Sequence, residues 1–340
     1  MKINNRRYIG CKYKLVDNIY DAVTEMGYGK DNTFADIFAG TGVVGNKFAE
    51  NGYKTIFNDN LESNVVAYKT WFGKDKIDKE KVDKIIDEYN LIDPKKIEEN
   101  YFSQVYGNKY FAENDAKVIG FIRDDIENRR DVNDREKCYL ISSLMYVTDK
   151  IANTVGHFES FLKKNPIEKG VHLDKIQINN NIIPADIYCE DVNNLVRHIK
   201  PDIVYIDPPY NARQYVNFYH VLENLVRWNK PTEFEGNSMK FKRNELKSGY
   251  CRNNKALGLF KDLIENLDCK LIVVSYNNTY VAKSSSSINT IKAEDIIDIL
   301  SKRGKVTIKS MEHKFFNAGK TDFTDHKELL YICEVGKWKS

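Results

Sequence analysis

The 340-residue chain has few cysteines, and the six that it has are scattered. None lies three or four residues from another, which excludes both the CxxC pair of a redox enzyme and the usual spacing of a zinc site. The six histidines are scattered too, so we expect no bound metal. Unpaired thiols of this kind are typical of a reducing compartment, and we expect a cytoplasmic protein.

Long apolar runs are also missing. No run approaches the ~18 residues that a membrane-spanning helix needs, and the densest, 271–274, has the length of a strand. The basic start, MKINNRRYIGCKYKL, has no apolar segment of the secretory type. We therefore expect no association with a membrane.

An excess of charge is lacking as well, because the formal net charge is only +3 and indicates no partner by itself. A composition of 42% hydrophobic and 30% charged residues can bury a sizeable core. The length fits two domains, or one domain with a large insertion.

One βαβ unit is visible near the start. Residues 33–40 (TFADIFAG) predict a short buried strand, 41–52 a helix that ends at a glycine, and 53–60 a second strand. This succession predicts a parallel sheet and an α/β fold.

The middle of the chain has a different texture. Residues 70–135 are rich in Lys, Asp, Glu, Ile and Tyr with helical spacing, and 135–152 predict an amphipathic helix. Strand character returns near 184–192. We therefore predict one domain with a sheet, made of 1–65 and 185–340, with a mostly helical insertion at 66–184; the resemblance given below implies that the first of these is the catalytic methyltransferase domain. Further strands are expected at 187–191, 202–207, 270–276, 305–311 and 328–335.

The segment from Gly40 to Gly45, GTGVVG, matches G-x-G-x-x-G between a strand and a helix, and Asp59 ends the next strand. Glycines let the backbone approach a ligand, and the acid can accept hydrogen bonds from ribose hydroxyls. The pattern suits a dinucleotide, S-adenosylmethionine, or a tight turn without a ligand.

The tetrapeptide Asp207-Pro208-Pro209-Tyr210 follows the strand at 202–206. Two prolines cannot continue a strand, so the chain turns out at the carboxyl end, where ligands bind in open α/β sheets. A carboxylate, a carbonyl and an aromatic ring within four residues suit the amine of a flat base. Alone, the motif could be a plain turn at the end of a strand.

With both motifs in this order, the chain resembles the Dam-related (α-group) N6-adenine DNA methyltransferases. Residues 207–228 and 273–281 look most like the adenine methyltransferase half-domains of the FokI restriction system. The resemblance covers roughly 1–65 and 185–340. It implies a Rossmann-like S-adenosylmethionine-dependent methyltransferase sheet, with target recognition in the helical insertion.

Cofactor roles follow by resemblance. Phe38, Gly40 and Gly42 look like the FxGxG loop, and 8–12 look like the family's N-terminal motif, with tyrosine where Dam has tryptophan. The remaining implied contacts are Tyr8 beside the cofactor, Lys12 at its carboxylate, Asp36 near its amine, Asp59 with Asn60 at the ribose, and Asp191 with Val192 at the adenine. Lys12 could instead be a solvated lysine, and Asp191 could cap a helix.

The resemblance implies direct methyl transfer to adenine N6. Asp207 and the Pro208 carbonyl would accept the amine hydrogens, and a base turned out of the duplex would stack on Tyr210. Pro209 completes the rigid turn.

Basic residues gather after this turn, where 211–256 hold nine Lys or Arg against four Glu. This stretch could face phosphates or be an ordinary solvated surface. Candidate DNA contacts are Asn153, His157, Arg213, Gln214, Tyr215, Lys242 and Arg243. Asn153 to His157 could equally cap the preceding helix at its C-terminus.

Other functions fit less well. No proline is followed by cysteine, which excludes cytosine-C5 methylation, and an N4-cytosine enzyme usually has serine in place of Asp207. A nicotinamide oxidoreductase leaves residues 207–210 unexplained, a silent DNA-binding protein would need a broken motif, and an RNA amine target stays open. We expect a monomer acting on double-stranded DNA, with a cognate restriction endonuclease as a candidate partner.

Overall fold

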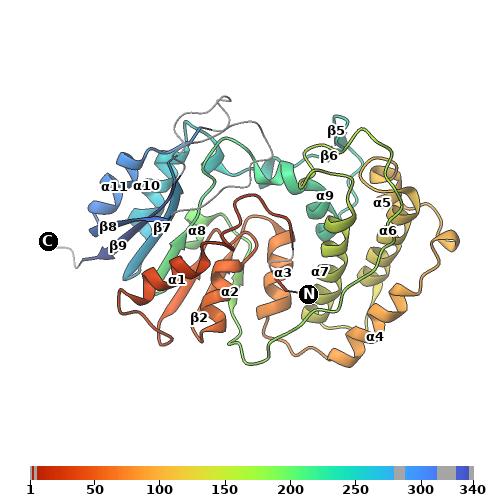
Figure 1. The fold of residues 1–340 in the computed structure, drawn as a ribbon, viewed down its shortest axis with the longest axis horizontal. Helices are drawn as coiled ribbons and strands as arrows, with labels where there is room; N and C mark the ends of the chain where they lie inside the picture. The colour runs from red at the N-terminus through yellow and green to blue at the C-terminus, as the bar shows by residue number, and fades with distance from the viewer. Residues whose placement is uncertain (1, 4–5, 279–287, 312–326, 337–340) are drawn as a thin grey trace. The chain divides into compact units, whose positions relative to one another are not determined.

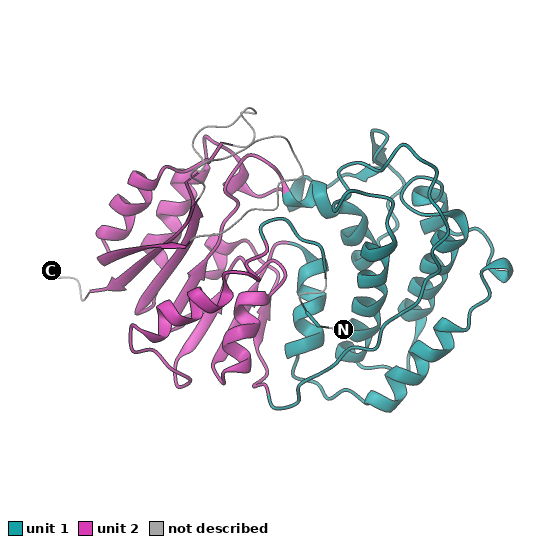
Figure 2. Cartoon of the chain, in the orientation of Figure 1, with its two compact units in different colours: residues 1–10, 61–181, 215–246 teal, residues 11–60, 182–214, 247–340 magenta. Residues whose placement is uncertain are grey.

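The computed structural model describes residues 2–3, 6–278, 288–311 and 327–336. Within them the chain forms two compact units (Figure 2). We call residues 11–60, 182–214 and 247–340 the sheet unit, and residues 1–10, 61–181 and 215–246 the helical unit. Each unit is built from segments that lie far apart in the sequence.

The sheet unit contains a seven-stranded sheet in the order β3-β2-β1-β4-β7-β9-β8 (Figure 1). The first five strands in this order pair in parallel, whereas β9 pairs antiparallel with both β7 and β8. The strands are β1 (Thr33–Asp36), β2 (Lys54–Asn58), β3 (Asp186–Tyr188), β4 (Ile203–Ile206), β7 (Leu271–Asn277), β8 (Gly304–Met311) and β9 (Glu328–Val335). The predicted strands and the α/β class are thus confirmed, with an antiparallel edge added.

Helices cover both faces of this sheet. Side chains alternate along a strand, so Ile203 and Tyr205 of β4 pack on one face, and Val204 and Ile206 on the other. The first face is covered by α1 and α2, and the second by α8, α10 and α11. These helices are α1 (Val16–Thr24), α2 (Val43–Glu50), α8 (Val192–Leu195), α10 (Ala256–Asn266) and α11 (Ala293–Ser301).

The helical unit is built around α7, an 18-residue helix that packs against α3, α6 and α9. Its helices are α3 (Glu62–Phe72), α4 (Lys79–Asn90), α5 (Tyr101–Tyr106), α6 (Glu113–Asn128), α7 (Asp134–Ile151) and α9 (Tyr215–Arg227). A two-stranded hairpin, β5 (Phe234–Glu235) and β6 (Lys240–Phe241), follows α9. Residues 66–184, all of them described, contribute no strand to the sheet.

The unit boundaries differ from the predicted domains, because residues 1–10 and 215–246 lie in the helical unit. Arg6 donates to the carbonyl oxygen of Ser63 (2.9 Å), which ties the N-terminal segment to α3. Glu223 of α9 is fully buried and accepts the backbone N–H groups of Glu62 (3.1 Å) and Ser63 (3.0 Å). These partners are distant in sequence, so no local pattern indicated them.

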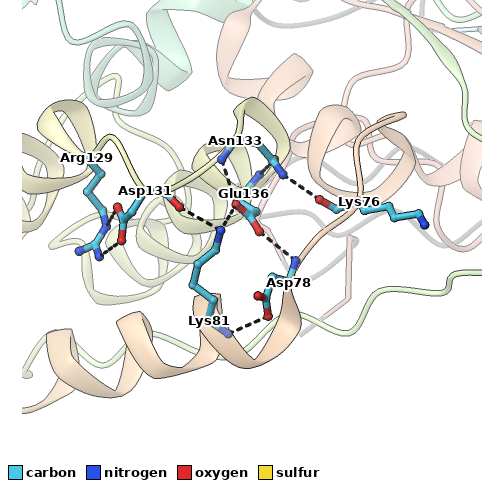
Figure 3. Close-up of polar contacts among 7 residues, drawn as sticks. All are labelled: Lys76, Asp78, Lys81, Arg129, Asp131, Asn133 and Glu136. Atoms are coloured by element: carbon cyan, nitrogen blue, oxygen red, sulfur yellow. Dashed lines mark hydrogen bonds and ion pairs between the residues drawn. The ribbon is translucent and has the colours of Figure 1, made fainter.

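One buried carboxylate fixes the starts of two helices in the helical unit (Figure 3). Glu136 accepts the backbone N–H groups of Asp78, the N-cap of α4, and of Asn133, the N-cap of α7, both at 2.9 Å. Lys81 lies 2.7 Å from the same carboxylate, and the Asn133 amide donates to the Lys76 carbonyl at 2.8 Å. The network satisfies N–H groups that a helix start leaves unpaired.

Candidate active site

The glycine turn lies at the carboxyl end of β1. Gly40 (φ 54°) and Gly42 (φ 76°) adopt left-handed backbone conformations that L side chains rarely adopt, and Gly42 is the N-cap of α2. Asp36, the last residue of β1, is buried and accepts the Gly45 N–H with Oδ2 (3.0 Å). Its Oδ1 is also buried and has no hydrogen-bond partner among the described residues. Burial raises the pKa of Asp36 to about 8.

A second acid lies at the end of the neighbouring strand. Asp59, just after β2, accepts the backbone N–H of Gly40 with Oδ2 (2.9 Å), so it holds the glycine turn, and Asn60 follows it. Sequence reasoning missed Asn58, whose buried amide bonds the Ile37 carbonyl (3.1 Å) and both backbone groups of Glu190. Through these hydrogen bonds Asn58 joins the carboxyl ends of three adjacent parallel strands, β1, β2 and β3.

Asp191 lies after β3 and caps α8, because its carboxylate accepts the Asn193 N–H at 3.0 Å. The capping alternative is thus confirmed, and the exposed carboxylate can still meet a ligand. Val192, the first residue of α8, is buried in the core of the sheet unit. Phe38 meets the ring of Tyr250 edge-on, with centroids 5.1 Å apart.

The proline turn follows the central strand β4. Asp207 accepts the hydroxyl of Tyr210 with Oδ1 (2.6 Å) and pairs with Lys12 Nζ through Oδ2 (2.8 Å). The Tyr210 carbonyl accepts the Thr290 N–H (2.7 Å) and the Tyr276 hydroxyl (3.1 Å), which fixes the turn. Both oxygens of Asp207 are therefore held in place, with the buried Pro208 between the acid and Pro209.

Sequence reasoning did not identify Glu328. It is the first residue of β9, its side chain is 2% exposed, and it lies 3.4 Å from Lys12 Nζ. It also accepts the hydroxyls of Ser275 (2.8 Å) and Tyr210. The signal was a single acid before the apolar run LLYIC, but only the sheet order places it beside Asp207.

The charged groups in this cluster shift one another's pKa values. Burial raises the pKa of Asp207, and Lys12 opposes that shift. Burial alone would lower the pKa of Lys12, but the carboxylates of Asp207 and Glu328 outweigh burial, so its pKa is raised. Burial also raises the pKa of Tyr210 well above its ordinary value. Lys12 is thus a buried ion-pair partner, and the alternative of a solvated lysine is wrong.

Two candidate DNA contacts lie in the sheet unit. Arg213 is exposed. Gln214 is partly buried, and its amide bonds both the N–H (2.8 Å) and the carbonyl (3.0 Å) of Ser248. The Gln214 side chain thus holds the chain leading to 249–251.

In the helical unit, the structure corrects two candidate DNA contacts. Arg243 is buried, pairs with Glu235 (3.0 Å) and bonds Asn217 (2.8 Å), so its guanidinium holds the hairpin and does not face solvent. The Asn153 amide donates to the carbonyls of Lys109, Leu162 and Lys164, so it holds the loop after α7. The residue that caps α7 at its C-terminus is Ala152, so the capping alternative for the 153–157 loop is wrong.

Three other candidate contacts of the helical unit differ in their exposure. Lys242 is exposed, while His157 and Tyr215 are partly buried. Tyr8 stacks on Tyr219 (centroids 4.6 Å, interplanar angle 8°) and lies 5.6 Å from the ring of Tyr215. Their roles toward DNA or a cofactor stay predictions.

Two other kinds of feature, a metal site and a membrane-spanning helix, are absent from the described residues. No group of three or more His, Cys, Asp or Glu side chains there is placed to hold a metal ion. No helix of the described chain has the length and apolar character to cross a bilayer.

The chain is similar to known proteins of one family. The model of a family described as D12 class N6 adenine-specific DNA methyltransferase matches residues 8–296. The chain is 34% identical to the modification methylase StsI of Streptococcus sanguinis, over 86% of this chain and 47% of StsI. It is 29% identical to the type II methyltransferase M.NlaIII of Neisseria lactamica, over 96% and 98%. It is 31% identical to M.FokI of Planomicrobium okeanokoites, over 80% and 44%. The chain spans about half the length of StsI and M.FokI, and nearly all of M.NlaIII.

Proposed function

The chain belongs to the D12 class N6 adenine-specific DNA methyltransferase family, and from this premise we propose that it transfers a methyl group from S-adenosylmethionine to adenine N6 in double-stranded DNA. One observation carries the proposal. Asp207 lies at the carboxyl end of the central strand, on a turn made rigid by two prolines, with Lys12 favouring its ionised form. An ionised acceptor in a fixed place is what an amine needs for orientation.

The residues around the glycine turn fit the cofactor. A buried carboxyl oxygen without a hydrogen-bond partner is costly, and among the described residues Oδ1 of Asp36 is such an atom, at the edge where ligands bind in this class of sheet. We assign it to the cofactor's amine, Asp59 and Asn60 to the ribose, and Asp191 and Val192 to the adenine. Phe38, Gly40 and Gly42 would complete the surroundings. S-adenosylmethionine supplies an electrophilic methyl group on a sulfonium.

The chain's own residues then present the amine. Removing an adenine from the duplex costs a few kcal/mol, and stacking on Tyr210 offsets about 1–3 kcal/mol of this. Asp207 accepts one amine hydrogen and the Pro208 carbonyl the other, which turns the nitrogen lone pair away from the ring. The Tyr210 hydroxyl already donates to Oδ1 of Asp207 in this structure, and a carboxylate oxygen has a second lone pair with which it can accept the amine hydrogen.

The finer assignments follow the order of the motifs. Cofactor loop, helical segment and proline turn succeed one another as in the Dam-related α-group, and we place the chain there. Relatives of the restriction-modification type support a cognate endonuclease as a partner and duplex DNA as the substrate. We propose a monomer with target recognition in the helical unit.

The test is expression in a host without adenine methylation, followed by mapping of N6-methyladenine. We expect one short sequence to be modified throughout the genome, and no modification with the Asp207→Asn variant. Purified protein that binds S-adenosylmethionine but leaves the genome unmodified, or that methylates only RNA, would contradict the proposal.

A further inference from the structure

Tyr276 of β7 lies against the proline turn, and no function has been given to it above. The residue is fully buried on the face of the sheet that also carries Val204 and Ile206. Its ring packs on the ring of Tyr210, with centroids 4.6 Å apart and an interplanar angle of 52°. This tilted arrangement is within the range that aromatic pairs prefer. Tyr276 therefore supports the ring on which the target base is proposed to stack.

The hydroxyl of Tyr276 holds the backbone of the same turn. It donates to the Tyr210 carbonyl (3.1 Å) and accepts the backbone N–H of Ile291 (3.2 Å). The Tyr210 carbonyl also accepts the N–H of Thr290 (2.7 Å). One side chain thus contacts both the ring and the backbone of Tyr210.

Two further contacts fix residues 289–291 beside the turn. The side-chain amide of Asn289 donates to the carbonyl of Asn277, the last residue of β7 (2.7 Å). The backbones of Asn289 and Asn211 form an isolated antiparallel bridge. The end of β7, this segment and the proline turn therefore form one hydrogen-bonded network around the side chain of Tyr276.

The plane of the Tyr210 ring needs support of this kind. Tyr210 is only partly buried, and its hydroxyl donates to Asp207 (2.6 Å). A hydrogen bond at the hydroxyl fixes the end of the side chain, but the ring can still rotate about the axis through that oxygen. Lys12 Nζ lies 5.0 Å from the ring centroid, but it meets the ring with a single polar group. The flat ring of Tyr276 is the larger contact, and a smaller side chain there would leave space for rotation.

We propose that Tyr276 is a positioning residue for methyl transfer, which sets the plane of the Tyr210 ring so that the target adenine can stack on it. The role in transfer rests on the proposed function, whereas the support of the Tyr210 ring does not. Tyr276 acts through Tyr210 and needs no contact with the adenine or the cofactor.

The first test is a double-mutant cycle between Tyr276→Leu and Tyr210→Ala, measured as kcat/KM on duplex DNA. Loss of a base stack corresponds to about 5–150-fold, and we expect Tyr276→Leu to cost about tenfold. Because Tyr276 acts through the Tyr210 ring, the same replacement should cost less than about twofold in the Tyr210→Ala background. Two independent structural effects would multiply instead.

Other replacements of Tyr276 separate its ring from its hydroxyl. Tyr276→Phe keeps the ring but loses the hydrogen bonds to Tyr210 and Ile291, and it should cost about threefold at most because Thr290 still holds the carbonyl. Tyr276→Met fills more of the space than leucine without a flat ring, so it repeats the cycle if the leucine variant unfolds. Affinity for S-adenosylmethionine should be unchanged in every variant.

The matched control is Tyr53, another fully buried tyrosine of the sheet unit. Its hydroxyl also donates to a backbone carbonyl, that of Tyr28 (3.0 Å), but its ring packs on the opposite face of the sheet. Tyr53→Leu should lower the thermal stability as Tyr276→Leu does, and leave kcat/KM within about twofold of the wild type. The proposal would be overturned by an unchanged kcat/KM for Tyr276→Leu, by the full cost persisting in the Tyr210→Ala background, or by an equal cost for Tyr53→Leu.

The second test needs no substrate. Relaxation of the ring-carbon NMR signals in protein with labelled tyrosine reports how fast each ring turns, and the Tyr210 signals are identified by their absence from Tyr210→Phe. We expect the Tyr210 ring to turn at least about tenfold faster in Tyr276→Leu than in the wild type, and no change in Tyr53→Leu. If the wild type proves inactive, the proposed function fails while this rate still decides whether Tyr276 holds the ring. An unchanged rate in Tyr276→Leu refutes the proposal.

Discussion

The replacement Asp207→Asn tests the central assignment, because it keeps the shape of the side chain and removes its charge. In the wild type the carboxylate lies 2.8 Å from Lys12 Nζ, and the two side chains are only 17% and 7% exposed. The amide of asparagine would place an N–H₂ group against either Lys12 or the Tyr210 hydroxyl. The buried ammonium then loses its nearest counter-charge.

Two magnitudes follow. Breaking a buried ion pair costs about 3–5 kcal/mol of stability when the partner stays charged, and the remaining Glu328 carboxyl brings the expected loss to the lower end. For the reaction, losing one preorganised polar group commonly costs about 2.7–4 kcal/mol of transition-state stabilisation. We therefore expect the methyl-transfer rate to fall by about 10²–10³-fold.

The assay is single-turnover transfer of a labelled methyl group to duplex DNA, with S-adenosylmethionine saturating. Calorimetry measures cofactor affinity, which we expect to change little because the glycine turn is intact. Thermal unfolding reports the stability loss. The matched control is Asp298→Asn on α11, whose carboxylate is exposed and, in the contacts described, pairs only with Lys302, the C-cap of that helix.

A transfer rate for Asp207→Asn within about tenfold of the wild type would refute the reasoning, since the carboxylate would then contribute less than about 1.4 kcal/mol. If the variant lost as much affinity for the cofactor as it lost in methyl-transfer rate, the reasoning would also be refuted, because Asp207 would then be a cofactor-binding residue.

Three further predictions concern the stacking ring, a buried acid and the glycine turn. Tyr210→Phe should keep most of kcat/KM on duplex DNA, whereas Tyr210→Ala should lose the about 1–3 kcal/mol of stacking; equal losses would contradict a stacking role. Burial raises the folded-state pKa of Glu223 from 4.5 to about 7. The side chain therefore contributes to the free energy of unfolding below about pH 4.5, and this contribution is lost as the pH rises toward about 7. Urea unfolding should show Glu223→Gln gaining on the wild type over that interval, and parallel curves would disprove this. Gly42→Ala forces an L side chain to φ 76°, costing about 1–2 kcal/mol, and should lower both Tm and cofactor affinity; an unchanged Tm would count against the turn geometry.

Local chemistry was sufficient to predict the framework of the sheet unit. Short apolar runs such as 202–207 and 328–335 form β4 and β9, because alternation along a strand buries both faces under helices. The glycines within 40–45 and the prolines within 207–210 predicted turns, because only those residues allow the backbone to turn in this way. Asp207 follows β4 as predicted, whereas the strand predicted at 33–40 ends earlier, at Asp36 on the neighbouring strand β1.

Contacts between distant segments were decided by the tertiary structure alone. Glu328 meets Lys12 and Asp207 because β9 inserts antiparallel beside β7, and sheet order is a global choice that no local spacing reports. In the sequence, Arg243 is one cation of a basic stretch. In the structure, its guanidinium pairs with Glu235 and donates to Asn217. The residue type determines which hydrogen bonds and ion pairs a side chain can form. The packing of the folded chain determines which partners it meets, and therefore its charge, its burial and whether a ligand can reach it.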